Sequence, residues 1–350
     1  MPMPAATPPT ATSVHPLARE EWLARRQEAV IEPLLPIVDP HHHLVDRPET
    51  GRYLLRELLA DIGAGHNVTH TVYLEWLSMY RAEGPVEFRP VGEVEFANGV
   101  AAASASAKYG SARVCAGIVG YADLALGAAV ERVLEAMVAA GGGRFRGIRY
   151  ISATHPDQRE WGTLVERPEG MLMDARVREG FARLAPLGLS FDAWMYHTQL
   201  AELVDLARAF PQTPIVLDHV GGPIGLGRYK GRREEVFAEW KARIREAAAC
   251  PNLHVKLGGL GMRIFGFGFH ERELPPSSEE LAAAWRPYVE TCIEAFGASR
   301  AMFESNFPVD KGSCGYVAAW NAFKRIAAGC SAAEKAALFS GTARKFYRLT

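Results

Sequence analysis

The stretch Ile37-Val38-Asp39-Pro40-His41-His42-His43-Leu44 runs from an apolar strand pattern directly into three histidines. Because side chains alternate faces along a strand, His41 and His43 are expected on one face and His42 on the other. Two imidazoles that converge on one point suit a metal ion or a polarised carbonyl. The run lies well inside the chain, unlike an affinity tag. We therefore interpret His41 and His43 as functional and His42 as structural.

Seven further β-type apolar runs follow this stretch, with helical segments between them. The eight runs span residues 36–43, 69–75, 112–121, 145–150, 189–196, 214–219, 253–257 and 300–305. The segments of helical character span residues 96–108, 128–140, 199–210, 232–249 and 278–296. Alternating strands and helices indicate a parallel sheet, and eight units predict a closed (β/α)8 TIM barrel of α/β class. A doubly wound open sheet is the alternative.

Polar side chains stand at or just past the end of every predicted strand. They are His41 and His43, Glu75, Tyr121 and Asp123, Arg149, His197, His219, Lys256, and Glu304 with Asn306. Barrel enzymes build their active sites on that rim, whereas an open sheet would concentrate such residues at one switch point. The pattern favours a barrel enzyme.

Composition limits the classes of partner. The chain has 350 residues, and its 39 Lys and Arg nearly balance its 40 Asp and Glu. Neither nucleic-acid binding nor attraction to an anionic membrane is indicated, so we expect a small-molecule substrate; a homo-oligomer is compatible with the sequence. The five cysteines include no CxxC pair, which favours a reducing cytoplasm over a disulfide framework. No apolar run reaches the roughly 18–20 residues that span a bilayer.

The N-terminal part divides into two expected segments before the barrel. Residues 1–16 are rich in Pro, Thr and Ala without the pattern of a signal peptide, and we expect a disordered leader. Residues 17–33 carry strong helix formers and charges, which predict one amphipathic helix. The barrel is expected over residues 34–350.

Six segments resemble, in order, the amidohydrolase superfamily, and specifically its branch of sugar lactonases and 2-pyrone-4,6-dicarboxylate lactonase. They are DPHHHL, GIRY at 147–150, FDAWMYHTQL at 191–200, IVLDHVGGP at 215–223, VKLGG at 255–259 and FESNFPVD at 303–310. The resemblance runs from about Pro36 to the C-terminus. It implies an amidohydrolase-type TIM barrel that hydrolyses a carbon–oxygen or carbon–nitrogen bond with water as the nucleophile.

The resemblance places the paired histidines of the family on His41 and His43, its strand-five histidine on His197 and its strand-six histidine on His219. It places the strand-eight acid on Asn306. An amide cannot accept a proton from water as a carboxylate does.

Two carboxylates could replace the missing base. They are Glu304, which shares the face of Asn306, and Asp310; His219 is a further candidate. Both carboxylates could instead be structural and hold Lys311 or Arg149.

The metal content stays open in the sequence. Three neutral imidazoles, those of His41, His43 and His197, could hold one divalent ion, with zinc the first choice, and leave a position for water. Without the acidic ligand, metal-free polarisation of a carbonyl by the histidines is also plausible.

Cationic and aromatic residues at the strand ends indicate which kind of substrate to expect. Arg149 and Lys256 could bind a carboxylate or an oxyanion. Alternatively, they form salt bridges to Glu75, Asp218 or Glu304 inside the barrel. The expected substrate-binding set is Glu75, Trp76, Arg149, Tyr196 and Lys256. Trp76, Trp194 and Tyr196 could line a ring-shaped substrate, or simply pack in the core.

The leading functional hypothesis is a hydrolase that opens a lactone of a small carboxylated or hydroxylated ring. One alternative is a metal-dependent decarboxylase of the related branch. The other is a barrel without a base at Asn306 that only binds ligand.

Overall fold

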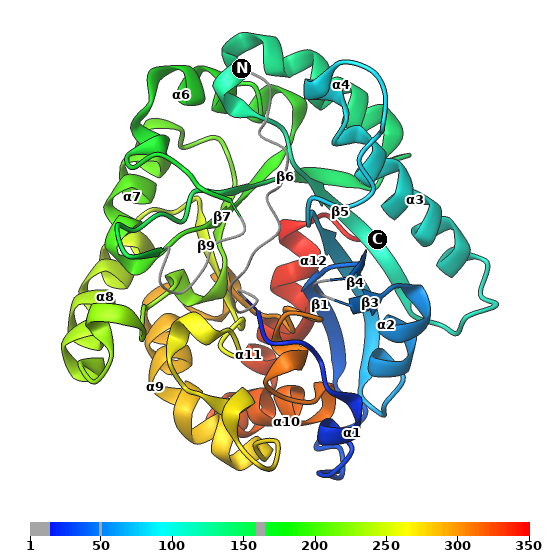
Figure 1. The fold of residues 1–350 in the computed structure, drawn as a ribbon, viewed down its shortest axis with the longest axis vertical. Helices are drawn as coiled ribbons and strands as arrows, with labels where there is room; N and C mark the ends of the chain where they lie inside the picture. The colour runs from blue at the N-terminus through cyan, green and yellow to red at the C-terminus, as the bar shows by residue number, and fades with distance from the viewer. Residues whose placement is uncertain (1–14, 49–50, 159–164) are drawn as a thin grey trace.

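Eight parallel strands form one sheet that curves into a barrel with helices outside it (Figure 1). The computed structural model describes residues 15–48, 51–158 and 165–350. The sheet follows chain order from β1 to β10, and its strands are β1 (Pro36–His42), β4 (Asn67–Leu74), β5 (Arg113–Gly120), β6 (Phe145–Ile151), β7 (Ser190–Trp194), β8 (Ile215–Leu217), β9 (Leu253–Leu257) and β10 (Ala301–Phe303). The predicted (β/α)8 barrel is confirmed.

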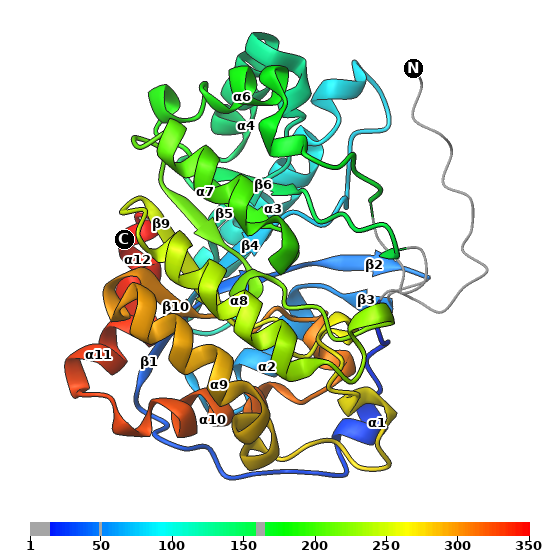
Figure 2. The same ribbon diagram turned by 90° about the vertical axis from the view of Figure 1, so that its left-hand side faces the viewer.

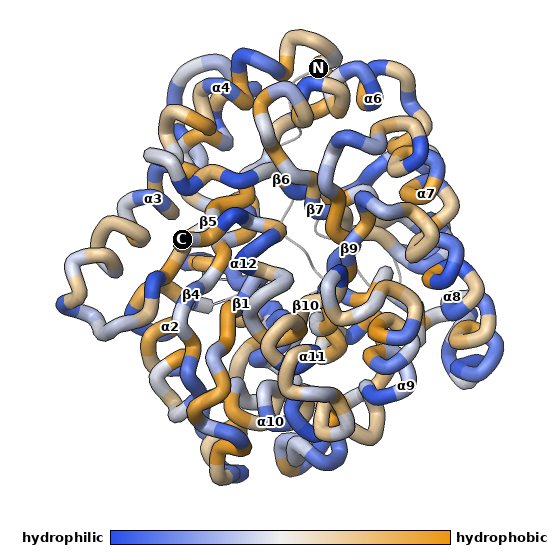
Figure 3. Tube along the Cα trace, turned by 180° about the vertical axis from the view of Figure 1, so that it is seen from behind, coloured by the Kyte–Doolittle hydropathy of each residue, from blue (hydrophilic) through white to orange (hydrophobic). Residues whose placement is uncertain are grey.

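Helices connect successive strands of the barrel. They are α2 (Leu55–Ile62), α3 (Val91–Ala105), α4 (Val130–Ala140), α6 (Ala175–Phe181), α7 (Leu200–Ala209), α8 (Arg233–Ala248) and α9 (Ser278–Phe296), and α10 (Tyr316–Ile326), α11 (Ala332–Ala336) and α12 (Thr342–Phe346) follow β10. Seen from behind, the strands are largely apolar, while the helices mix apolar and polar positions (Figure 3). Buried apolar residues of helices such as α4, α7 and α9 belong to the core around the sheet.

Helix α9 shows how local sequence sets an element boundary. The Ser277 hydroxyl accepts a hydrogen bond from the backbone N–H of Glu280 (3.2 Å), and the Glu280 carboxylate accepts one from the N–H of Ser277 (2.7 Å). This capping box satisfies two N–H groups that a helix start leaves without partners. The helix ends before Gly297, whose φ of 72° suits glycine.

The barrel closes through loop backbone at the rim where the strands have their carboxyl ends. Strands β1 and β10 form no ladder with each other in the described sheet. Instead, the N–H of His43 donates to the carbonyl of Phe307 (2.8 Å), and the N–H of Asn306 donates to the carbonyl of His41 (3.0 Å). The histidine run and the segment after β10 therefore hold each other in place.

Side chains and one helix fill the barrel interior. Val38, Val72, Val119, Val216 and Met302 form a buried cluster with Phe346 and Tyr347, at the end of α12. Figures 1 and 3 both show α12 within the outline of the ring of strands. The interior is a packed core rather than a channel, as in other barrels of this type.

The N-terminal segment differs from the predicted helix over residues 17–33. Helix α1 spans only Glu20–Leu23. Further along, the backbone bonds to α10 instead of forming an i to i−4 ladder. Asn321 binds Ile31 N–H (2.8 Å) and the carbonyl of Ala29 (2.9 Å), and Lys324 donates to the carbonyl of Ile31 (2.7 Å). Tertiary hydrogen bonds override the local helix preference here.

Two further features concern the predicted boundaries. The expected disordered leader over residues 1–16 lies outside the described residues except for its last two. A hairpin of β2 (Val45–Arg47) and β3 (Gly51–Tyr53), which the sequence did not predict, follows β1 and lies at one end of the barrel, on the same side as α1 (Figure 2). Within the described residues, no helix is both long and apolar enough to cross a membrane.

Candidate active site

His41 and His43 converge at the end of β1, as the alternation of the strand predicts. Their Nε2 atoms are 3.2 Å apart, and both side chains are buried. The Nδ1 of His43 is 3.0 Å from the carbonyl oxygen of Leu74, which can only accept. His43 therefore carries its proton on Nδ1 and presents a lone pair at Nε2. His42 points away and hydrogen-bonds Thr71 (2.8 Å), so its predicted structural role is confirmed.

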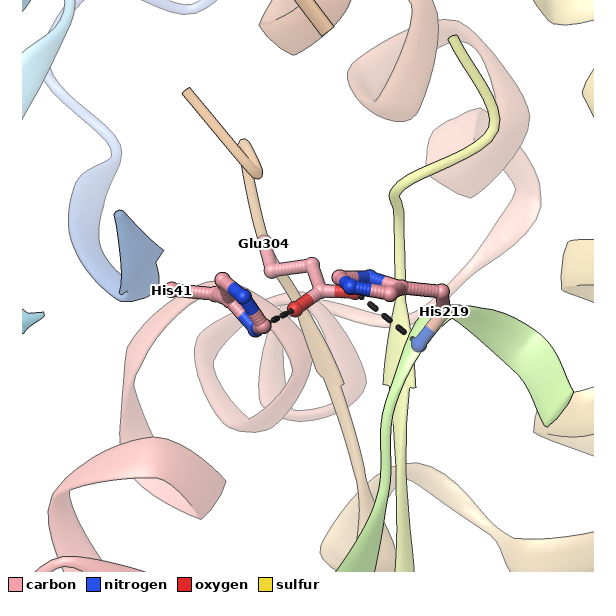
Figure 4. A group of neighbouring side chains, drawn as sticks. All are labelled: His41, His219 and Glu304. Carbon is pink, nitrogen blue, oxygen red and sulfur yellow. Dashed lines mark hydrogen bonds and ion pairs between the residues drawn. The ribbon is translucent and has the colours of Figure 1, made fainter. Parts of the chain in front are cut away.

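Glu304 lies between two imidazoles and aligns them (Figure 4). Its carboxylate accepts from the Nδ1 of His219 (2.7 Å) and from the backbone N–H of the same residue (3.2 Å). Its second oxygen is 2.7 Å from the Nδ1 of His41. Since Glu304 has no exposed surface, it orients these rings and does not meet solvent.

His219 is neutral and has a lone pair directed away from Glu304. Burial is the largest cause that lowers its pKa to about 3, although the charge of Asp218 opposes the shift. With Nδ1 donating to Glu304, the neutral ring has its lone pair on Nε2. An imidazole that a carboxylate orients in this way can accept a proton through Nε2.

The backbone at His219 departs from strand geometry. Asp218 continues the alternation of β8 and, like Val216, points into the barrel, where it contacts Lys256 (3.0 Å) and lies 3.6 Å from His41. His219 would face outward on a regular strand, but β8 ends at Leu217 and His219 adopts a left-handed φ of 53°, and its ring reaches Glu304. Gly259 makes room for this conformation, because a Cβ there would lie 2.3 Å from the Nδ1 of His219.

A fully buried ion cluster lies against His41. The ammonium of Lys256 contacts Asp192 (2.7 Å) and Asp218 (3.0 Å), and it is 3.0 Å from the Nδ1 of His41. Burial alone would lower the pKa of Lys256, but Asp192 and Asp218 outweigh it and raise the pKa. Tyr347 donates to the same Asp192 oxygen (2.5 Å). These contacts are the internal salt bridge that the sequence left open for Lys256.

Arg149 is also held inside the barrel. Its Nε donates to Glu75 (2.8 Å), which is one of the alternatives considered above. Its side chain still reaches the histidines, since one terminal nitrogen is 3.4 Å from the Nε2 of His41. The ring of Trp76 packs on His43, with centroids 4.3 Å apart. Glu75, Trp76 and Arg149 therefore form one side of the site.

His197 and Tyr196 follow β7 on the rim. The Nδ1 of His197 accepts from the N–H of Ile224 (3.3 Å), so the neutral ring carries its proton on Nε2. No described residue hydrogen-bonds to this buried Nε2. The ring of His197 packs against Tyr229, with centroids 5.5 Å apart, and it is not in the group of candidate ligand atoms found among the described residues, so the structure does not bring it together with His41 and His43 as predicted. Tyr196 is buried and packs edge-on against Trp194, which itself packs against His219.

Asn306 and Asp310 are bound to each other. The Asn306 amide donates to Asp310 (2.9 Å), whose other oxygen accepts from the N–H of Gly261 (2.8 Å). Burial raises the pKa of Asp310 to about 8. Neither Asp310 nor Glu304 pairs with Lys311 or Arg149, because the partners of Lys311 are Asp61 and Glu20.

The charges and geometry of the site fit a divalent cation. Two cations, Arg149 and Lys256, face four carboxylates, those of Glu75, Asp192, Asp218 and Glu304, which leaves a formal charge of −2 when all are ionised. Two nitrogens bound to one zinc ion at about 2.0–2.1 Å lie about 3.0–3.4 Å apart, which brackets the separation of the His41 and His43 Nε2 atoms. The Oδ2 of Asp218 is buried without a hydrogen-bond partner among the described residues, whereas its Oδ1 lies 3.0 Å from the Lys256 ammonium.

The cluster of candidate ligand atoms differs in two of its three residues from the predicted set of His41, His43 and His197. Among the described residues, the possible ligand atoms that come within 4.8 Å of one another belong to His41, His219 and Glu304. The neutral ring of His41 can carry its proton on either nitrogen, and the two tautomers have different partners. When its Nδ1 donates to Glu304, its Nε2 is free to bind a cation beside His43. When its Nδ1 accepts from Lys256, its Nε2 proton can donate to His43.

Comparison with known proteins agrees with this architecture. The sequence profile described as amidohydrolase matches residues 38–349. The chain is 35% identical to the uncharacterized protein y4mH of Sinorhizobium fredii over 89% of this chain and 98% of that protein. It is 30% identical to an L-fucono-1,5-lactonase of Burkholderia multivorans over 68% of this chain and 73% of that protein.

A solved structure has the same fold. An amidohydrolase of Burkholderia multivorans with bound zinc superposes with a TM-score of 0.67 at 23% identity, covering 90% of this chain and 99% of that one. The chain belongs to the amidohydrolase family. It is an enzyme of the hydrolase class built on a (β/α)8 barrel.

Two residues of the site were missed in the sequence. Asp192 lies in the middle of β7. A carboxylate within the mainly apolar run SFDAW could have indicated a buried charge inside the barrel. Tyr347 follows the short helix α12, and nothing in its local pattern indicates that it enters the barrel.

Proposed function

We propose that this protein is a lactonase that opens the ring ester of a small hydroxylated or carboxylated acid. The observation that carries the proposal is the pair of His219 and Glu304, which places a neutral imidazole with a free lone pair on the rim beside His41 and His43. The likeness to an L-fucono-1,5-lactonase supports a sugar-acid lactone as the first substrate to test.

The residues of the chain suit each part of the reaction. His219 accepts a proton from water through Nε2 while water adds to the lactone carbonyl. The carboxylate of Glu304 stabilises the imidazolium that forms, so Glu304 is a positioning residue. The ring carbon–oxygen bond then breaks, and His219 returns its proton to the departing alkoxide, which gives the open hydroxy acid.

We also propose one divalent ion, with zinc the first choice, held by His41 and His43 with Glu304 or His219 nearby. Bound there, the ion would act as a Lewis acid towards the carbonyl and lower the pKa of water. The zinc in the related solved structure and the negative charge of this cluster support the assignment.

A panel of substrates tests the reaction class. The purified protein is expected to open L-fucono-1,5-lactone or another sugar lactone, measured by the acid released in a weakly buffered indicator assay. Aromatic carboxylic acids serve as the comparison, because a decarboxylase would release carbon dioxide from them. Decarboxylation without any ring opening, from a folded protein, would overturn the proposal.

Metal removal tests the cofactor. Elemental analysis of the purified protein is expected to find a divalent ion, and dialysis against EDTA is expected to remove it and lower kcat, with recovery when zinc is added. His41→Ala should reduce the bound metal, whereas His270→Ala, on a surface loop, should not. Full activity in a protein shown to be metal-free would favour polarisation of the carbonyl by histidines alone.

A further inference from the structure

We propose that the segment 15–26 is a strap across the mouth of the barrel, and that His15 forms part of the substrate pocket wall and limits the size of the lactone. The inference rests on the proposed function for the identity of the substrate. Figure 1 shows the described chain beginning near the centre of the ring and running outward to α1.

His15 lies beside the catalytic histidines. Its ring centroid is 5.5 Å from that of Trp76, and Trp76 packs on His43 at 4.3 Å. Burial is the largest cause that lowers the pKa of His15 to about 3, and the positive charges of Arg149 and Arg263 lower it further. Arg149 lies on β6 and Arg263 lies in the loop after β9, so the charges that act on His15 come from two separate parts of the rim.

The strap is fastened to the loops after β9 and β10. Trp22 donates through its indole nitrogen to the carbonyls of Arg272 (3.1 Å) and Glu273 (3.0 Å), and Glu20 pairs with Lys311 (2.9 Å). The carbonyl of Pro16 packs directly on Gly312, where a Cβ would lie only 2.1 Å from that oxygen. These contacts hold His15 over the mouth.

The strap lies outside the part of the chain that matches the amidohydrolase family, which begins at residue 38. The base and the paired histidines all lie within the matched part. The strap therefore adds a wall to a site whose chemistry is complete without it, and such a wall acts on substrate choice rather than on the reacting bond.

Two lactones that differ only in bulk test the inference. D-Glucono-1,5-lactone is compared with lactobiono-1,5-lactone, which carries an additional galactosyl group. The wild-type protein is expected to favour the smaller lactone. His15→Ala is expected to lower the ratio of the two kcat/KM values about ten-fold, mainly through KM for the larger lactone.

Two further variants separate the wall from the folding of the strap. Trp22→Phe keeps an aromatic ring but removes the donor that fastens the strap, and it is expected to change the ratio in the same direction. His270→Ala removes an imidazole while keeping the backbone carbonyl that accepts from Arg19, and it is expected to leave the ratio unchanged. An unchanged ratio in a folded His15→Ala protein would overturn the inference.

The role of His15 can also be tested by binding, without turnover, if the protein is not a lactonase. If the wild-type protein opens neither lactone, the binding of D-gluconate and lactobionate is measured by calorimetry. A preference of the wild-type protein for D-gluconate that His15→Ala reduces would support the wall. Equal affinities in the two proteins, or no binding of either acid, would overturn it.

Discussion

Replacing His219 by asparagine is expected to lower kcat about 10²–10⁴-fold, because it removes the group that takes the proton from water. Asparagine can keep a hydrogen bond to Glu304, so the buried carboxylate retains a partner and the barrel should stay folded. Measurement of kcat and KM on a sugar lactone, with circular dichroism as the check on folding, decides the result. His270→Asn is the matched control and should leave kcat unchanged.

A companion variant tests the part of Glu304 in the same step. Glu304→Gln can still accept a hydrogen bond from the Nδ1 of His219 but carries no charge to stabilise the imidazolium. We expect a lower kcat and an altered pH profile of kcat, with KM little changed. Wild-type kcat in either variant would contradict the assignment of His219 as the base.

Replacing Lys256 by methionine is expected to lower the free energy of unfolding by about 3–5 kcal/mol. The ammonium has no exposed surface and is the shared partner of Asp192 and Asp218. Methionine fills a similar volume but leaves two buried carboxylates without their cation. Urea unfolding followed by fluorescence measures the loss.

The exposed Lys230 provides the control for this variant. Lys230→Met is expected to change the free energy of unfolding by no more than about 0.5 kcal/mol, as is usual for surface substitutions. A loss below about 1 kcal/mol for Lys256→Met would be typical of a solvent-screened pair and would contradict the buried cluster.

The barrel and much of its rim could be predicted because both depend on local patterns. The eight apolar runs match the eight strands of the sheet within a few residues at each end. The convergence of His41 and His43 follows from the alternation of a single strand. Charge pairing was less predictable, because Arg149 and Lys256 each had several candidate partners, and only the assembled barrel selects among them.

The errors have a common physical origin. Alternation along a regular strand would put Asp218 and His219 on opposite faces, whereas the left-handed backbone at His219 brings both side chains to the barrel interior. The helix predicted over residues 17–33 is shortened because Asn321 and Lys324, about 290 residues away, bind its backbone. In both cases a contact distant in sequence decides a local conformation, and no window of neighbouring residues contains that information.

The seam that closes the barrel has a consequence for how the protein becomes active. The backbone of His41 and His43 joins that of Asn306 and Phe307, and nearby Asp39 binds the N–H of Ser305 across 266 positions. Contacts of such long range are slow to form, because a large loop must first be closed. The seam and the catalytic rim share these residues, so a refolding chain gains activity only when its first and last strands meet. The rate at which activity returns on refolding is therefore expected to equal the rate at which the barrel closes.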